Sequence, residues 1–237
     1  MSFGRQFFLS RATHLKKTEI GTKNMTAIGK FDPNKPSTDL CDLPATEVRR
    51  MIADRTISPV ELMESCLKRV GQTNSTLNAI VTLDEEAGMK IARQKEAELM
   101  TGEPLGLLHG LPMVIKDNRD TAGMRTTHGS LLFADHIPDQ DDPTVKLVRD
   151  AGSVIFGKTN LPEFGAGGNT VNRLFGTTCN PYDSTLTCGG SSGGAAVAVA
   201  TGMTMLATGS DYGGSLRTPA SFCGIVGFRP TPGVAPS

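Results

Sequence analysis

The sequence predicts an α/β fold in which a central β-sheet is covered by helices on both faces. From about residue 110 onward, short apolar stretches of strand length alternate with stretches of helical periodicity, and this alternation is typical of α/β domains. The glycine density rises after residue 165. With 237 residues the chain can bury one sizeable core or two small ones.

Capping signals and apolar spacing place the individual elements. The run SPVE at residues 58–61 combines a capping box with a proline in the first helical turn. Apolar residues then recur at Leu62, Cys66 and Val70, which lie on one face of a helix. Further helices are expected at residues 46–53, 84–100, 144–151, 195–201 and 216–222, and strands at 79–83, 112–115, 153–156, 203–207 and 225–228.

The charge balance argues against a nucleic-acid or membrane-surface partner. The chain carries 24 basic and 24 acidic residues, so no overall field attracts polyanions, and a small uncharged substrate is as compatible with this balance as any other. No apolar run approaches the length of a membrane span. Neither a metal nor a cofactor is expected, and the oligomeric state stays open, a homo-oligomer included.

The five cysteines are scattered, odd in number and without a CxxC spacing. Neither a disulfide framework nor a structural zinc site is therefore expected, and reduced thiols in a cytoplasmic protein are the prediction. Cys188 lies beside a glycine loop and is a candidate thiol nucleophile, but no histidine lies near it in sequence. We expect Cys188 to fill a turn.

The N-terminal segment is basic. Its first 25 residues hold five lysine or arginine residues and one acid, Glu19, a composition similar to that of an organellar presequence. A flexible tail, or translation that starts at Met25, is the preferred interpretation because the apolar residues form only one short patch. Residues 1–43 are therefore expected to be a flexible tail and arm, and residues 44–237 a single domain.

Three segments carry candidate chemistry, and the first is the apolar strand that ends in Lys116. Burial at that position would lower the pKa of the amine and make it a candidate general base. A lysine at a strand end more commonly extends into solvent. This segment alone therefore does not identify a site.

The second segment is the GGSSGG run at residues 189–194, which leads directly into an apolar helix. Glycines before a helix allow close packing and turn backbone N–H groups toward an anion. A phosphate-binding loop is therefore one candidate, and a plain flexible turn is another. The run lacks the Gly-Lys-Ser/Thr ending of a P-loop and the GxGxxG pattern of a dinucleotide site.

The third segment, GSDYGGSLR at residues 209–217, places Ser215 after two glycines at the start of a helical stretch. A hydroxyl at that position lies near exposed backbone N–H groups, as a nucleophile beside an oxyanion hole requires. The alternative is that Ser215 only caps the helix.

Together, the three segments resemble the amidase signature family, with a GxPxxxKD strand, a GGSSGG loop and a G[ST]DxGGS[IL]R loop. Ser191 and Ser215 lie 24 positions apart, as in that family, and the run PASFCGIVGFRPT at residues 219–231 is also similar. The resemblance covers residues 45–235. It implies a mixed central sheet with helices on both faces.

The resemblance also implies an amidase that cleaves the C–N bond of linear amides through an acyl-enzyme intermediate. Ser215 would attack the carbonyl carbon, Lys116 would be the neutral general base, and Ser191, placed after a cis peptide bond, would relay the proton between them. The implied oxyanion hole consists of the backbone N–H groups of Tyr212, Gly213, Gly214 and Ser215. The implied supporting residues are Ser192 and the ion-paired Asp211 and Arg217.

Two other functions stay open. Members of the family continue further than residue 237, so the chain is expected to be a fragment or truncated product that lacks the C-terminal part, and a non-catalytic remnant or subunit is one alternative. The other is the glutamine-hydrolysing A-type subunit of an amidotransferase. Cys188, Ser210 and Tyr212 are more similar to the residues of stand-alone amidases.

Overall fold

A six-stranded mixed sheet forms the centre of the fold in the computed structural model, which describes residues 6–10 and 39–235. Its strand order is β2-β4-β3-β7-β1-β8, with β3 parallel to β4 and β7 and the other pairs antiparallel. The strands are β1 (Gln6–Ser10), β2 (Ile80–Leu83), β3 (Pro112–Lys116), β4 (Val154–Thr159), β7 (Leu206–Ser210) and β8 (Val226–Gly227), and a separate hairpin pairs β5 (Val171–Asn172) with β6 (Gly176–Thr177).

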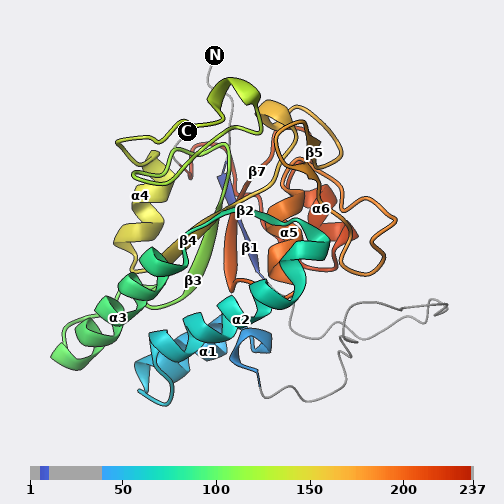
Figure 1. The fold of residues 1–237 in the computed structure, drawn as a ribbon. Helices are drawn as coiled ribbons and strands as arrows, with labels where there is room; N and C mark the ends of the chain where they lie inside the picture. Colours follow the sequence, from blue (N-terminus) through green and yellow to red (C-terminus); the bar gives the residue numbers. More distant parts are fainter. Residues whose placement is uncertain (1–5, 11–38, 236–237) are drawn as a thin grey trace.

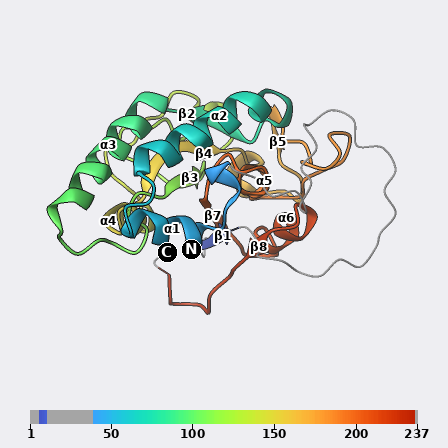
Figure 2. The ribbon, with the colours of Figure 1, turned by 90° about the horizontal axis from the view of Figure 1, so that it is seen from below.

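Helices cover both faces of this sheet (Figure 1). They are α1 (Ala45–Ala53), α2 (Pro59–Leu77), α3 (Glu85–Thr101), α4 (Pro143–Asp150), α5 (Gly193–Ala200) and α6 (Arg217–Phe222), with short 3-10 turns at Leu40–Asp42, Leu131–Phe133 and Glu163–Gly165. Figure 2 shows α2 and α3 on one side of the strands and α4 on the other. The predicted fold class is thus confirmed. No helix in the described part of the chain is long and apolar enough to cross a membrane.

Apolar clusters lie on both faces of the sheet. The largest of the three joins α2, α3, α5 and α6 to side chains such as Val114 and Phe156, a second lies between α1 and α2, and the smallest joins α4 to Met113, Ile115 and Ile155. Side chains alternate along β3, so its odd-numbered and even-numbered residues point to opposite faces of the sheet. Lys116, at the end of that strand, therefore lies on the same face as Val114 and α5.

The predicted start of α2 is confirmed in detail. Ser58 Oγ accepts from the Glu61 N–H (3.1 Å), and the Glu61 carboxylate accepts from the Ser58 N–H (2.8 Å). The helix ends at Asn78, which has a left-handed backbone conformation (φ 52°) that suits asparagine. Local sequence therefore determines both ends of this helix.

A β-bulge changes the direction of the side chains in β4. Met113 lies opposite Ile155, but Val114 lies opposite Gly157, so β4 holds one extra residue at this point. Beyond the bulge Ile115 lies opposite Lys158, and Lys116 lies opposite Thr159. Residues that lie opposite one another share a face, so the two lysines point to opposite faces of the sheet.

Two sequence-based expectations differ from the structure. Within the expected tail and arm, residues 6–10 form β1 between β7 and β8, because their backbone groups complete the antiparallel pairing with β7, and Cys41 is buried near residue 43. The strand expected at residues 203–207 begins at 206, because the Thr204 hydroxyl donates to the Pro112 carbonyl (3.1 Å) within a preceding turn. Most of the segment considered as a presequence lies outside the described residues, and the domain boundary stays a prediction.

Candidate active site

The three predicted motifs meet where β3 and β7 end. Lys116 is fully buried, and its Nζ lies 2.7 Å from Ser191 Oγ, 2.9 Å from Ser192 Oγ and 2.8 Å from Ser210 Oγ. The backbone N–H of Lys116 donates to Thr208 Oγ1 (2.9 Å), which ties the end of β3 to β7. Four hydroxyl groups thus surround the end of one strand, and the amine of Lys116 has no carboxylate among its hydrogen-bond partners in the described part of the chain.

The hydroxyl partners allow Lys116 to be neutral. The Ser192 hydroxyl donates its proton to the Ser210 carbonyl (3.3 Å), so it can only accept from the lysine. A neutral amine has two N–H donors and one lone pair. It can therefore donate to Ser192 and to one of the other two hydroxyls and accept from the remaining one. Neither Ser191 nor Ser210 donates its hydroxyl proton elsewhere among the described residues, so each is placed to deliver a proton to the lysine.

The environment of Lys116 favours this neutral form. Burial lowers the pKa of Lys116 to about 7, the positive charge of Arg119 acts in the same direction, and the negative charge of Asp211 opposes both. A general base that works at neutral pH needs a pKa in this range. The geometry and the pKa thus support the same role for this lysine.

The GGSSGG loop holds the two serines between β7 and α5. The Gly190–Ser191 peptide bond is cis, as the family resemblance implies, and the Ser192 N–H donates to the Ser215 carbonyl (2.9 Å), which joins this loop to the loop that carries Ser215. A Cβ on Gly193 would lie 2.2 Å from Thr170 Oγ1, so only glycine lets the start of α5 approach its neighbour this closely. The run is therefore a tightly packed loop with a defined shape.

Asp211 organises the loop that carries Ser215. Its fully buried carboxylate accepts from the Arg217 guanidinium (2.9 and 3.0 Å) and from the N–H groups of Gly214 (2.9 Å) and Leu216 (3.2 Å). Burial would raise the pKa of Asp211, but these hydrogen bonds, those from Arg217 above all, lower it to about 2. The expected Asp211–Arg217 ion pair is thus present.

Replacing Asp211 with asparagine is expected to lower the free energy of unfolding by about 3 kcal/mol, because it removes buried charge-assisted hydrogen bonds. The carboxylate has a pKa of about 2 in the folded chain and about 3.9 in the unfolded chain. Its contribution is therefore complete above pH about 4 and is lost as the pH falls toward 2. Urea unfolding at several pH values measures both effects. Asp54→Asn, at an exposed ion pair with Arg50, is the control and should change the free energy by less than about 0.5 kcal/mol.

A cavity of about 340 Å³ lies in front of Ser215. Its walls are two glycine-rich segments, residues 165–168 and 212–215, together with Gly190 and Thr218. None of the described residues accepts a hydrogen bond from the N–H of Gly213 or Ser215, so both can donate to an oxyanion. The structure differs from the predicted oxyanion hole at Gly214, because the Gly214 N–H already donates to the Asp211 carboxylate.

Other reactive side chains lie away from this chemistry. Cys188 is buried as expected, and burial raises the pKa of its thiol to about 11, which is unsuited to a nucleophile. His109 contacts the Lys95 carbonyl (2.9 Å), and His128 lies 3.6 Å from Asp120. Neither histidine contacts Lys116 among the described residues.

One group near α2 brings potential metal ligands together. Asp39, Cys41 and Asp42 place a thiol and two carboxylates close to one another. The Arg69 guanidinium binds both carboxylates, at 3.3 and 2.9 Å. An arginine between the carboxylates makes this group an ion-pair network that joins the start of the described domain to α2.

A family model described as Amidase matches residues 61–237 of the chain. The chain belongs to the amidase signature family. The A-type subunit of the glutamyl-tRNA(Gln) amidotransferase of Carboxydothermus hydrogenoformans is 44% identical over 195 residues, which cover 82% of this chain and 40% of that relative. An acylamidase of Rhodococcus erythropolis is 44% identical over 194 residues, which cover 82% of this chain and 41% of the relative. The chain thus spans about 40% of the length of these curated relatives.

Solved structures of amidase signature enzymes share the fold. A bacterial aryl acylamidase superimposes with a TM-score of 0.71 and 35% identity over 75% of this chain and 37% of the other. Fatty acid amide hydrolase superimposes with a TM-score of 0.74 and 28% identity over 78% of this chain and 33% of the other. The described sheet and helices are therefore those of the amidase signature fold.

Sequence reasoning missed two residues of the hydroxyl network, Ser210 and Thr208. Both belong to β7, and Ser210 stands directly before Asp211 in the GSD part of the third motif. Their position at the end of an apolar strand, beside a motif already chosen, is the signal that could have identified them. That they contact Lys116 depends on the pairing of β3 with β7.

Proposed function

We propose that this amidase signature chain hydrolyses a C–N amide bond through an acyl-enzyme on Ser215. The observation that carries the proposal is the 2.7 Å contact between the buried Lys116 amine and Ser191 Oγ. In the attack step, Ser215 Oγ bonds to the amide carbon while its proton passes to Ser191 and the Ser191 proton passes to neutral Lys116. The N–H groups of Gly213 and Ser215 stabilise the resulting oxyanion.

The second half of the reaction reverses the proton path. The Lys116 ammonium returns a proton through Ser191 to the leaving nitrogen, and the C–N bond breaks to leave the acyl group on Ser215. Water then attacks the ester, again with Lys116 as the base, and releases the acid. The cycle ends with Lys116 neutral and the Ser215 hydroxyl protonated again.

We propose linear amides as the substrate class. The cavity of about 340 Å³ in front of Ser215 is lined mainly by glycines, with Tyr212 as the one bulky residue of the lining, so an extended chain can lie along the glycine-rich wall. The acylamidase relative and the structural similarity to fatty acid amide hydrolase support an acyl amide as substrate. A cytoplasmic location and a homo-oligomer stay predictions.

A fluorophosphonate probe and a panel of linear amides test the function. The chain should be labelled on Ser215 and should release amine from at least one member of the panel. An intact, folded protein that shows neither labelling nor turnover would support the alternative of a non-catalytic subunit. Peptide mapping of the labelled protein identifies the modified serine.

Glutamine hydrolysis for an amidotransferase is the second candidate, favoured by the 44% identity to the A-type subunit of a glutamyl-tRNA(Gln) amidotransferase. Its discriminating measurement is ammonia release from glutamine compared with amine release from acyl anilides. Turnover of glutamine alone would support the amidotransferase hypothesis, and turnover of the anilides would support the stand-alone amidase.

Ser191→Ala is expected to lower kcat/KM by about 10³-fold or more, because it interrupts the proton path between Ser215 and Lys116. Ser192→Ala should lower it less, because the Ser192 hydroxyl donates to a backbone carbonyl and only accepts from the lysine. Steady-state kinetics on the best amide of the panel gives both values. Equal losses in the two variants would contradict the assignment of Ser191 as the relay.

A further inference from the structure

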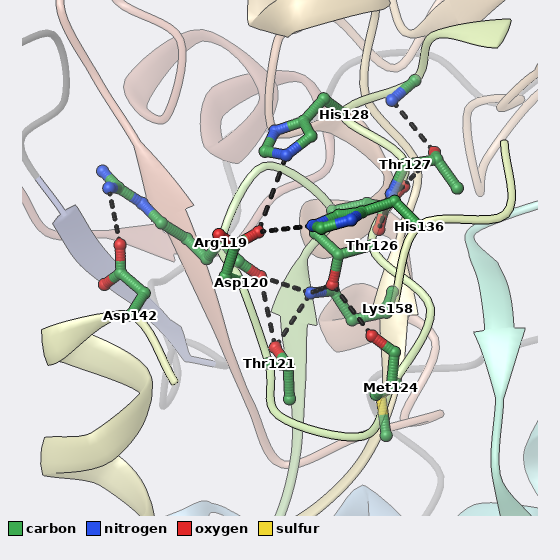
Figure 3. A network of polar contacts seen from close by, with 12 residues as sticks. Arg119, Asp120, Thr121, Met124, Thr126, Thr127, His128, His136, Asp142 and Lys158 are labelled. Atoms are coloured by element: carbon green, nitrogen blue, oxygen red, sulfur yellow. Dashed lines mark hydrogen bonds and ion pairs between the residues drawn. The ribbon is translucent and has the colours of Figure 1, made fainter. Parts of the chain in front are cut away.

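Lys158 is a second buried lysine of the central sheet, and the hydrolytic steps above do not use it. Its side chain has 0% exposure. Because of the bulge in β4, it lies beside Ile115 on the face opposite to Lys116. Figure 3 shows its amine pointing into the loop of residues 117–127, which directly follows Lys116.

The hydrogen-bond partners of Lys158 require the charged form of this lysine. Lys158 Nζ donates to the Arg119 carbonyl, to Thr121 Oγ1 (2.9 Å) and to Thr126 Oγ1 (2.8 Å). Each hydroxyl already donates its only proton to a carbonyl, Thr121 to Arg119 (3.2 Å) and Thr126 to Met124 (3.1 Å). All three partners can therefore only accept from Lys158. An ammonium has three N–H donors and a neutral amine has two, so the full network requires the ammonium.

The charges around Lys158 help it to keep its proton at neutral pH. Burial lowers the pKa of Lys158 to about 8. The carboxylates that oppose this shift are those of Asp117, Asp120, Asp141 and Asp142. The other ionisable groups of this region are Arg119, Arg125, His128 and His136. The lysine is therefore protonated at pH 7 and loses its proton as the pH rises through about 8.

The loop held by this lysine reaches the active site at both of its ends. At its start, Asn118 Nδ2 donates to Ser210 Oγ (3.4 Å), one of the hydroxyls around the catalytic lysine. Just after its end, the His128 carbonyl accepts from the Phe164 N–H (2.7 Å), and the next residue, Gly165, lines the active-site cavity. A shift of the loop would therefore move a neighbour of the catalytic lysine and a wall of the cavity together.

We propose that Lys158, as an ammonium ion, is a positioning residue for the amidase reaction: it fixes the loop of residues 117–127 and thereby keeps Asn118 and Gly165 in place. The inference rests on the proposed function, since it concerns the same site. The two buried lysines thus have opposite charge requirements on opposite faces of one sheet. Lys116 must be neutral to accept a proton, and Lys158 must be charged to satisfy three acceptors.

Lys158→Met, which keeps a side chain of similar length without charge, tests the proposal. It is expected to lower kcat about tenfold to a hundredfold and to change KM less than about threefold, because a small displacement of a reacting group costs turnover more than binding. Hydrogen exchange of residues 117–127 should become faster, while exchange in α2 stays the same. The double variant Thr121→Val/Thr126→Val keeps the lysine, removes two acceptors and should act in the same direction.

Thr73→Val is the matched control, because it removes a buried hydroxyl that donates to a backbone carbonyl in α2 (2.8 Å to Arg69). It should change neither kcat nor loop exchange. In the wild type, loop exchange corrected for the intrinsic amide rate should rise above pH about 8, and Lys158→Met should lack this rise.

Unchanged kcat or unchanged loop exchange in both the Lys158→Met and the double-threonine variants would overturn the proposal. A merely structural lysine would lower thermal stability and leave the kcat of the folded protein as it is. Hydrogen exchange needs no substrate. A wild-type chain that hydrolyses no amide would therefore contradict the proposed function, while the exchange experiment would still test the role of Lys158.

Discussion

Ser215→Ala is expected to lower kcat/KM by about 10⁴-fold or more and to abolish labelling by a fluorophosphonate. Without the hydroxyl no acyl-enzyme can form, and water would have to attack the amide directly. The fold should be retained, because the Ser215 side chain makes no hydrogen bond to the described residues and its backbone carbonyl still accepts from Ser192 (2.9 Å). Circular dichroism measures whether the fold is retained, and fluorophosphonate labelling of the same sample measures whether the nucleophile is lost.

Ser221→Ala is the matched control for this variant. Ser221 is an exposed serine in α6, six residues after the proposed nucleophile, and its loss should leave kcat/KM and labelling unchanged. Labelling that survives in Ser215→Ala would show that another side chain is the nucleophile and would contradict the proposed mechanism.

Lys116→Arg is expected to lower kcat/KM by about 10³-fold or more, although arginine is also a basic residue with a long side chain. A guanidinium group cannot lose its proton in a protein, so it cannot act as the base. Lys116→Met should cause a similar loss, since an apolar side chain also lacks a base. The similarity of the two losses would identify the neutral amine, rather than a positive charge, as the group that the reaction needs.

The pH profile of the wild type gives an independent measure of the same role. The pKa of Lys116 is about 7, and the neutral form is the active one, so kcat/KM should fall as the pH drops through about 7. It should fall again as the pH rises through about 8, where Lys158 loses its proton. Lys146→Arg, at an exposed lysine of α4 that pairs with Asp150 (2.9 Å), should keep the wild-type profile. A profile that rises toward low pH would contradict a neutral lysine base.

Much of the site could be predicted because its chemistry lies in short, contiguous motifs. Lys116, Ser191 and Ser215 each belong to a run of fewer than ten residues whose glycines and flanking apolar residues mark a strand end or a helix start. The capping box at Ser58 is equally local, and it gave the correct start of α2. Local patterns of this kind depend on backbone geometry that neighbouring residues determine.

Features that depend on pairing between distant segments could not be predicted in this way. The pairing of β1 with β7 joins residues 6–10 to residues 206–210, and no local pattern specifies such a partner. The hydrogen bond from the Gly214 N–H to Asp211 follows from the folded shape of the loop of residues 211–217. The contact between Ser210 and Lys116 likewise requires β3 and β7 to lie side by side.

By itself, the sequence determined the family, the fold class and the identity of the candidate triad, because these depend on residue types at fixed spacing along the chain. The tertiary structure decided the surroundings of the two buried lysines, on which the proposed difference in their charge depends. A bulge in β4 turns Lys158 away from Lys116, so the two amines have different partners. Lys116 contacts three hydroxyls, and two of these have protons that are not used elsewhere among the described residues. Lys158 contacts three oxygen atoms that can only accept a hydrogen bond. Burial and the count of donors around each amine arise only from contacts between segments that are distant in the chain.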